Sequence, residues 1–118
     1  CVHLSLLGRS RRKQMHALAE YLEKTTDPDS LLIVAGDFND WRNRADDLLA
    51  DRLGMIEVFG KSRGRPVRSF PAVIPFLRLD RIYVRGFDIT RVELHSGPGW
   101  SAISDHAALS AHLIFKAA

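Results

Sequence analysis

The sequence predicts a single α/β domain with a mixed β-sheet and helices on at least one face. Strand-like and helix-like segments alternate in the first half of the 118 residues, and strand-like segments dominate the second half. The chain is 46% hydrophobic and 26% charged, which is ordinary for a globular protein and excludes a disordered or fibrous one. A chain of this length has room for one compact domain.

The first three elements read as strand, helix and strand. Residues Cys1 to Leu7 alternate in the manner of a half-buried strand. Ser10 is a suitable N-cap for a helix with an apolar stripe at helical spacing, and this helix should end near Thr25, ahead of a proline. Leu31 to Ala35 is a short apolar run, which suits a strand covered on both faces.

The second half begins with a helix and then turns to strands. The helix is expected from about Asn43 to Leu53, with Gly54 as its C-cap. From Gly60 onward, three prolines break up a stretch that is not expected to form regular helix. A Gly97-Pro98-Gly99 turn separates the last two of three further strands, which we expect at Leu77 to Val84, Ile89 to His95 and Ala107 to Phe115.

Composition also bears on the compartment. No apolar run approaches the ~20 residues that cross a bilayer, and no basic-then-apolar leader opens the chain. We therefore expect no transmembrane segment and no secretory precursor. The single cysteine, Cys1, excludes an intrachain disulfide and favours a cytoplasmic location.

The formal net charge of +3 is unevenly distributed. Both basic groups could face a phosphate-bearing substrate, and both could equally be solvated surface charge. The second is interleaved with glycines, as in a loop. The first basic group consists of Arg9, Arg11, Arg12 and Lys13, and the second consists of Lys61, Arg63, Arg65 and Arg68.

Three short clusters place acids, an amide and a histidine at the ends of predicted strands, where α/β proteins build their sites. Asp37 and Asn39 are two residues apart on an extended segment, so both side chains can point toward one ligand. Asp80 lies inside an apolar strand and needs a partner other than Arg81, which points to the opposite face. The clusters are Gly36-Asp37-Phe38-Asn39-Asp40, Leu79-Asp80-Arg81-Ile82 and Ser104-Asp105-His106.

These clusters, in this order and approximate spacing, resemble the C-terminal motifs of the endonuclease/exonuclease/phosphatase superfamily. The opening Val2-His3-Leu4 resembles the preceding strand of that family, and Ser69-Phe70-Pro71 resembles its Thr-Phe-Pro element. The resemblance spans residues 2 to 115. It implies half of a four-layer α/β sandwich and a Mg²⁺-dependent hydrolase of phosphate esters, with Mn²⁺ as a possible substitute.

The resemblance also implies a role for each residue. Asp37 would align or deprotonate the attacking water, and Asn39 would hydrogen-bond the phosphate. Asp105 would be a metal ligand, directly or through water, which fits the oxygen ligands that Mg²⁺ prefers. His106 would contact the scissile phosphate, and Asp80 would orient His106 and favour its protonated form. His3 matches a family histidine near the site whose role varies.

Simpler interpretations stay open beside these. The Asp37-Asn39-Asp40 segment taken alone could be a turn with Asx hydrogen bonds. His16, His95 and His112 lie outside the motifs, and we assign them to packing or the surface. Trp41 and Trp100 lie beside two of the motifs and are assigned to packing.

The family also uses an asparagine and a metal-binding glutamate from strands that would precede Cys1. We therefore expect residues 1–118 to be the C-terminal half of the domain, with the N-terminal half as its natural partner. On that basis the isolated chain should be inactive and should form a homodimer through its uncovered sheet face. The substrate would be a phosphate ester, in nucleic acid or a phospholipid headgroup. The alternative is a non-catalytic module that binds nucleic acid or phosphate.

Overall fold

The computed structural model describes residues 1–40, 45–72 and 77–116. The predicted α/β class is confirmed. No helix in this described part is long and apolar enough to cross a bilayer. The elements are β1 (Val2–His3), α1 (Gly8–Thr25), β2 (Leu32–Asp37), α2 (Ala45–Leu53), β3 (Ile56–Glu57), α3 (Val58–Arg63), β4 (Asp80–Arg85), β5 (Phe87–His95), α4 (Pro98–Ser101) and β6 (Ala108–Phe115).

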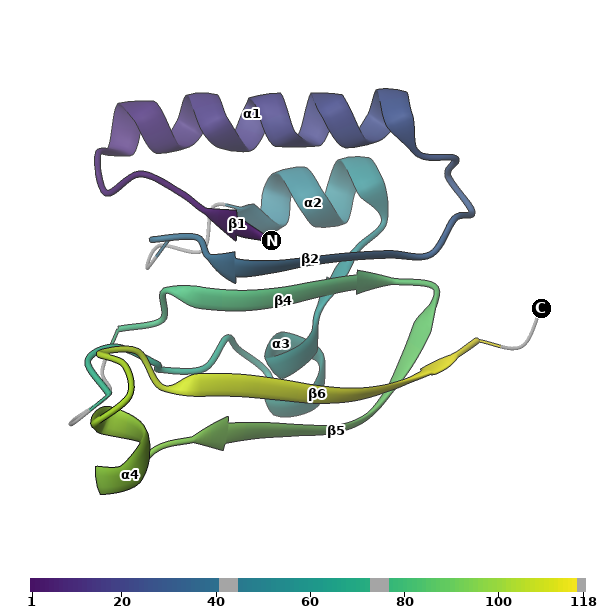
Figure 1. Ribbon diagram of the computed structural model, residues 1–118. Helices are drawn as coiled ribbons and strands as arrows, with labels where there is room; N and C mark the ends of the chain where they lie inside the picture. Colours follow the sequence, from purple (N-terminus) through teal and green to yellow (C-terminus); the bar gives the residue numbers. More distant parts are fainter. Residues whose placement is uncertain (41–44, 73–76, 117–118) are drawn as a thin grey trace.

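Four strands form a mixed sheet in the order β1-β2-β4-β3, with β1 parallel to β2 and β4 antiparallel to β2 and β3. This agrees with the mixed sheet that the sequence predicts. The last two strands differ from the prediction, because β5 and β6 pair with each other as an antiparallel hairpin with its own sheet. Figure 1 shows this hairpin beyond β4, on the side away from β1 and β2.

Helices α1 and α2 lie together on one face of the four-stranded sheet (Figure 1). Helix α1 ends at Thr25, as predicted, but Ser10 is not its N-cap: Leu7 holds that position without a side-chain cap. The helix begins earlier because the Arg11 amide already donates to the Leu7 carbonyl at 2.8 Å. Residues 43 and 44 of the second predicted helix lie outside the described residues; the described part ends at Leu53, followed by Gly54 with φ +66°.

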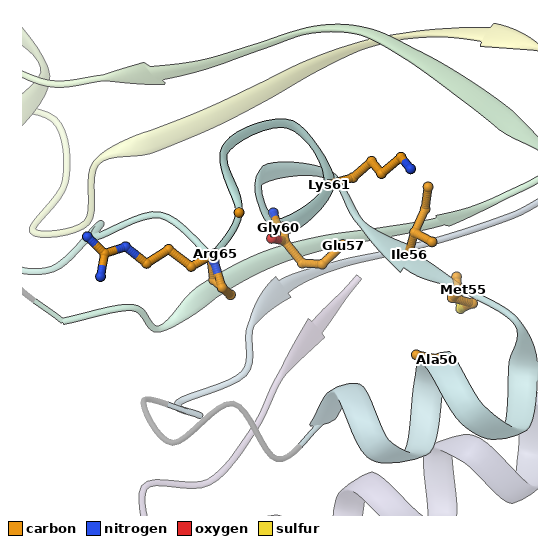
Figure 2. Close-up of a pocket in the computed structure, with 9 residues that line it drawn as sticks. Ala50, Met55, Ile56, Glu57, Gly60, Lys61 and Arg65 are labelled. Atoms are coloured by element: carbon orange, nitrogen blue, oxygen red, sulfur yellow. Dashed lines mark hydrogen bonds between the residues drawn. The ribbon is translucent and has the colours of Figure 1, made fainter.

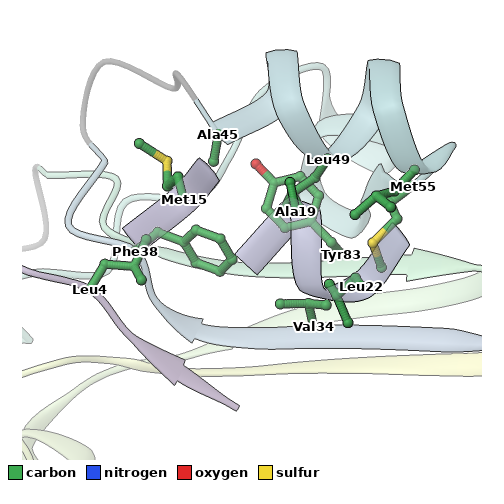
Figure 3. Close-up of a cluster of buried hydrophobic side chains, with 11 residues drawn as sticks. Leu4, Met15, Ala19, Leu22, Val34, Phe38, Ala45, Leu49, Met55 and Tyr83 are labelled. Carbon is green, nitrogen blue, oxygen red and sulfur yellow. The ribbon is translucent and has the colours of Figure 1, made fainter. Parts of the chain in front are cut away.

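The two helices and the sheet enclose the larger core, which we call the N-terminal core (Figure 3). Phe38 and Tyr83 are fully buried in it, with ring centroids 5.3 Å apart. Because Phe38 directly follows Asp37, its burial fixes the direction in which the chain leaves β2. The buried members are Leu4, Met15, Ala19, Leu22, Val34, Phe38, Ala45, Leu49, Leu53, Met55 and Tyr83.

A smaller cluster, the hairpin core, lies between β4, α3 and the β5–β6 hairpin. In the described part of the chain, only Val58, Phe59 and Val84 are fully buried there, and eight partly buried apolar side chains pack around them. Helix α3 continues to Arg63, so the expectation of no regular helix from Gly60 onward is wrong for these residues. The Glu57 carboxylate caps this helix by accepting the Gly60 N–H at 2.8 Å.

Two further expectations are corrected. Strand β2 is not covered on both faces, since Val34 is 4% exposed and faces the helices, whereas Ile33 on the other face is 49% exposed. The predicted turn at Gly97 leads into the short helix α4, with Pro98 at its first position, where a missing N–H costs nothing. Trp41 lies outside the described residues.

Candidate active site

The candidate site forms where β2 ends and β4 begins. Asp37 and Asp80 are directly opposite each other in the antiparallel register of the two strands. Opposite residues share a face of the sheet, so both carboxylates lie on the side away from α1 and α2. The parallel register of β1 adds His3 beside Asp37, and the His3 Nε2 atom lies 3.5 Å from the Asp37 Oδ2 atom.

Gly36 allows β1 to approach this closely. Its φ is +143°, and a Cβ atom at this position would lie 1.9 Å from the Val2 carbonyl oxygen. No side chain fits in that space, and L-residues rarely adopt this backbone conformation. The glycine before Asp37 is therefore required for the pairing that brings His3 to the site.

His106 joins the two carboxylates from the segment that leads into β6. Its Nδ1 atom donates to Asp80 Oδ2 at 2.7 Å, and its Nε2 atom lies 3.6 Å from Asp37 Oδ2. The predicted Asp80–His106 hydrogen bond is confirmed. The Ser69 hydroxyl donates to the same Asp80 oxygen, so two donors fix the Asp80 carboxylate in place.

Segment 69–72 holds the final motif against the sheet. The Ala107 amide donates to the Ser69 carbonyl, and the Ala72 amide donates to the Asp105 carbonyl, each at 2.7 Å. The Phe70 ring packs on the His106 imidazole with centroids 4.8 Å apart. These contacts hold His106 from the backbone and from one ring face, so segment 69–72 positions the histidine.

The electrostatics of the site favour a protonated His106. Burial alone would lower the pKa of His106, but the hydrogen bond and charge of Asp80, supported by Asp37 and Asp105, raise it above its ordinary value. Burial raises the pKa of Asp37, and the nearby Asp80 charge adds to this shift. The Asn39 amide and the two histidines oppose it.

Asn39 lies at the site, but its side-chain amide group already donates a hydrogen bond within the protein. It is 3% exposed and adopts φ +48°, a left-handed conformation that asparagine tolerates. Its Nδ2 atom donates to the Leu4 carbonyl, and its backbone N–H donates to Asp37 Oδ1 at 2.9 Å. The Asx hydrogen bond of the simpler interpretation is therefore present, and a contact from Asn39 to phosphate stays a prediction.

Asp40 follows with a structural role. It is 1% exposed, and its Oδ2 atom accepts the Ala45 N–H at 2.7 Å at the start of α2. The guanidinium of Arg81, which is also buried, donates to the Asp40 carbonyl at 2.6 Å. Arg81 therefore points away from Asp80, as the strand alternation predicts.

Three side chains of the site could ligate a metal ion. Asp37, Asp80 and His106 each offer one ligand atom, and these atoms lie within 4.8 Å of one another. Asp105, the predicted ligand, is not in this group; it is exposed and lines the same cavity. Its role as a ligand stays a prediction.

All six predicted residues line one cavity of about 510 Å³, which also receives Leu6, Phe70 and Leu79. The predicted convergence of distant motifs at one place is therefore present in the structure. Ser69 is the main participant without a predicted role. Its position in the Ser69-Phe70-Pro71 element before the Asp80 strand was the available signal. The six predicted residues that line the cavity are His3, Asp37, Asn39, Asp80, Asp105 and His106.

Comparisons with known proteins identify relatives in sequence and in fold. The protein named "Uncharacterized protein YbhP" of Escherichia coli K12 is 43% identical over 113 residues, which is 96% of this chain and 44% of YbhP. A functionally unknown conserved protein from Enterococcus faecalis superposes with a TM-score of 0.77 at 20% identity, over 98% of this chain and 48% of that one. The mannosyl-6-phosphatase Bt3783 of Bacteroides thetaiotaomicron gives 0.69 at 20% identity, over 96% and 49%.

The chain thus spans about half the length of the relatives it matches. The two structural likenesses show a shared fold. The sequence profile described as "Endonuclease/Exonuclease/phosphatase family" matches residues 1–106, which include the three motif clusters. This chain belongs to the endonuclease/exonuclease/phosphatase family.

Proposed function

We propose that this chain carries the C-terminal half of the active site of a divalent-metal-dependent phosphoric ester hydrolase. The observation that carries the proposal is the Asp80–His106–Asp37 arrangement at the cavity. A histidine whose Nδ1 atom is held by a carboxylate presents its Nε2 atom in one orientation. A raised His106 pKa makes Nε2 an N–H donor that can stabilise charge on a phosphate oxygen.

Asp37 supplies the second function. Its Oδ2 atom faces the cavity between His3 and His106. Because the pKa of Asp37 is raised by burial, it is better suited to accept a proton than an exposed aspartate is. Asp37 would orient a water molecule for attack in line with the leaving group and take its proton.

The donor set fits Mg²⁺, or Mn²⁺ in its place, because both ions take carboxylate oxygens and water. Asp37 and Asp80 put two carboxylates on one cavity, and Asp105 adds a third at its rim. Asp80 Oδ2 already accepts two hydrogen bonds and Asp37 is assigned to the attacking water, so Asp105 is the better candidate to hold the ion directly. Such an ion would neutralise charge on the phosphate.

The test is hydrolysis of bis-p-nitrophenyl phosphate and p-nitrophenyl phosphate by the full-length protein of which residues 1–118 form a part. We expect turnover with Mg²⁺ or Mn²⁺, its loss with EDTA, and a loss of at least about 100-fold in kcat in His106→Ala. His16→Ala is the matched control, because His16 lies exposed on α1. Turnover that survives both EDTA and His106→Ala would refute the proposal.

We further propose that the 118-residue chain alone is inactive and that the rest of a longer polypeptide completes the metal site. The half-exposed Ile33 on the sheet face opposite α1 and α2 supports a partner on that face, either this further segment or, for the isolated chain, a second copy. Light scattering of residues 1–118 tests the second copy: a stable monomer at micromolar concentration would refute it.

A further inference from the structure

A group of arginines next to the site is not used by the proposed chemistry. Arg65 and Arg68 are exposed, and Arg78 is partly buried. No salt bridge to any of the three occurs among the described residues. Guanidinium groups that gather without salt bridges on two adjacent segments form a local positive field that favours an anion.

Arg78 is the fixed member of the group. Its Nε atom donates to the Pro66 carbonyl at 2.9 Å, which places its guanidinium between Arg65 and Arg68 along the opposing segment. The hydrogen bonds of the described residues engage only this Nε atom of the guanidinium. The two terminal nitrogens therefore remain available as a preoriented fork, the geometry that binds two oxygens of a phosphate.

The charges in this group act on one another. Burial lowers the pKa of Arg78, and Arg68, Arg65 and Arg81 lower it further by repulsion. The Glu57 carboxylate lines a cavity with Arg65, but it forms no salt bridge with these arginines among the described residues. Figure 2 shows Arg65 extending away from Glu57, with Lys61 on the opposite side. A bound anion would offset the repulsion.

The arginines adjoin the catalytic cavity through both of their segments. Phe70 bridges to Leu77 in an antiparallel pair, so the segments that carry Arg68 and Arg78 run side by side into the site. Arg68 precedes Phe70 by two residues, and Arg78 precedes Asp80 by two. Two residues of extended chain span about 7 Å, which is within reach of a substrate that occupies the cavity.

We propose that Arg65, Arg68 and Arg78 form a second anion subsite, which binds a phosphate group of the substrate other than the one that is cleaved. The substrate is therefore a molecule with at least two phosphates. This inference rests on the proposed function for its catalytic part, and on the arginine geometry for the subsite. The second phosphate could be a terminal monoester of a small molecule or the next diester of a nucleic acid strand.

The kinetic test uses three esters with the same leaving group: thymidine 5′-(p-nitrophenyl phosphate) with a 3′-hydroxyl, a 3′-phosphate or a 3′-methyl phosphate. We expect kcat/KM to be about tenfold or more higher with a 3′-phosphate group than with the hydroxyl, because the contact is a charge-assisted hydrogen bond. Arg68→Gln and Arg78→Gln should each reduce this ratio toward one. Arg12→Gln, on the exposed side of α1, should leave it unchanged.

The ester with a 3′-methyl phosphate distinguishes the two possible sources of the second phosphate. A preference for the 3′-phosphate alone indicates a small molecule with a terminal phosphate, and an equal preference for the 3′-methyl phosphate indicates a nucleic acid strand. A wild-type ratio near one, or a high ratio that survives in Arg68→Gln and Arg78→Gln, would overturn the subsite.

A second measurement needs no turnover and so separates the subsite from the catalytic proposal. Inorganic phosphate is titrated into ¹⁵N-labelled protein with EDTA present, and the arginine Nε–Hε resonances are followed by NMR. We expect the Arg78 resonance to shift in a saturable way, and the Arg12 resonance to stay fixed. Equal small shifts at both arginines would overturn the subsite even if the enzyme hydrolyses phosphate esters.

Discussion

The N-terminal core and the hairpin core differ in how completely they are buried. Among the described residues, eleven side chains are buried in the first, whereas three are buried in the second and its other members are partly exposed. The site takes Asp37 and Asp80 from the sheet of the first region, and His106 from the segment that leads into β6. The carboxylates therefore lie on the more stable framework, and the histidine is held by the less stable one.

This difference suggests how the site can open. Separation of the hairpin would move His106 away from Asp80 while the four-stranded sheet and its two carboxylates stay in place. Segment 69–72 opposes that movement through its two backbone hydrogen bonds and the Phe70 ring. The integrity of the site thus depends on a few contacts between the two regions, and the following predictions test that dependence.

The largest effect is expected from core truncation. Leu49→Ala removes a side chain that is 2% exposed and should lower the free energy of unfolding by about 2–5 kcal/mol. Leu113→Ala, at a partly buried position in the hairpin core, should cost less than about 2 kcal/mol, since less apolar area is lost. Chemical denaturation measures both. Equal costs would show that the two cores are equally well packed.

Next in size is Gly36→Ala, which should cost clearly more than about 1 kcal/mol and detach His3 from Asp37. Gly64→Ala is the matched control, because Gly64 also has a positive φ, +89°, but a Cβ atom there would meet nothing within 4 Å. The difference between the two variants isolates the contact with Val2. Denaturation curves give the costs, and the nuclear Overhauser effects between β1 and β2 report the pairing. Similar costs would mean that backbone strain alone explains both.

A smaller effect is expected from pH. The folded-state pKa of His106 is raised, so its stabilising contribution is fully present below its unfolded value of about 6.5 and is lost as the pH rises through the folded value. The free energy of unfolding should therefore fall as the pH rises from about 6.5 through the folded value. Asp80→Asn, which removes the main cause of the shift, should flatten this part of the profile.

The profile of His106→Gln provides the check on this assignment, because it removes the titrating group itself. If the fall in stability persists in both variants, a group other than the His106–Asp80 pair causes it.

The sequence predicted the long elements and the Asp80–His106 pairing well. Helices α1 and α2 and strands β4 to β6 have enough residues for their periodicity to be recognised. The Asp80–His106 contact followed from the motifs and from the alternation that excluded Arg81 as a partner. Tertiary contacts decided the parts that were missed, because β3 has two residues and α3 has six. Pairing with β4 defines β3, and the burial of Val58 and Phe59 with Val84 defines α3.

The candidate site shows the same division between features that the sequence predicted and features that depend on tertiary contacts. The strand registers explain why Asp37, Asp80 and His3 meet, and the motifs indicated these residues in advance. The engagement of the Asn39 amide by the Leu4 carbonyl and the hydrogen bond from Ser69 to Asp80 join residues far apart in the chain. A local pattern carries no information about such contacts, so only the structure reveals them.

The central claim is that a divalent ion binds at the cavity between Asp37, Asp80, Asp105 and His106. Mn²⁺ titration of ¹⁵N-labelled protein, followed by paramagnetic broadening of amide resonances, tests it directly, since broadening falls steeply with distance from the ion. The account predicts that the amides of residues 37, 80, 105 and 106 broaden first, and that Asp37→Asn with Asp105→Asn removes the effect. Broadening centred on any other acidic group, or unchanged in that double variant, would contradict it.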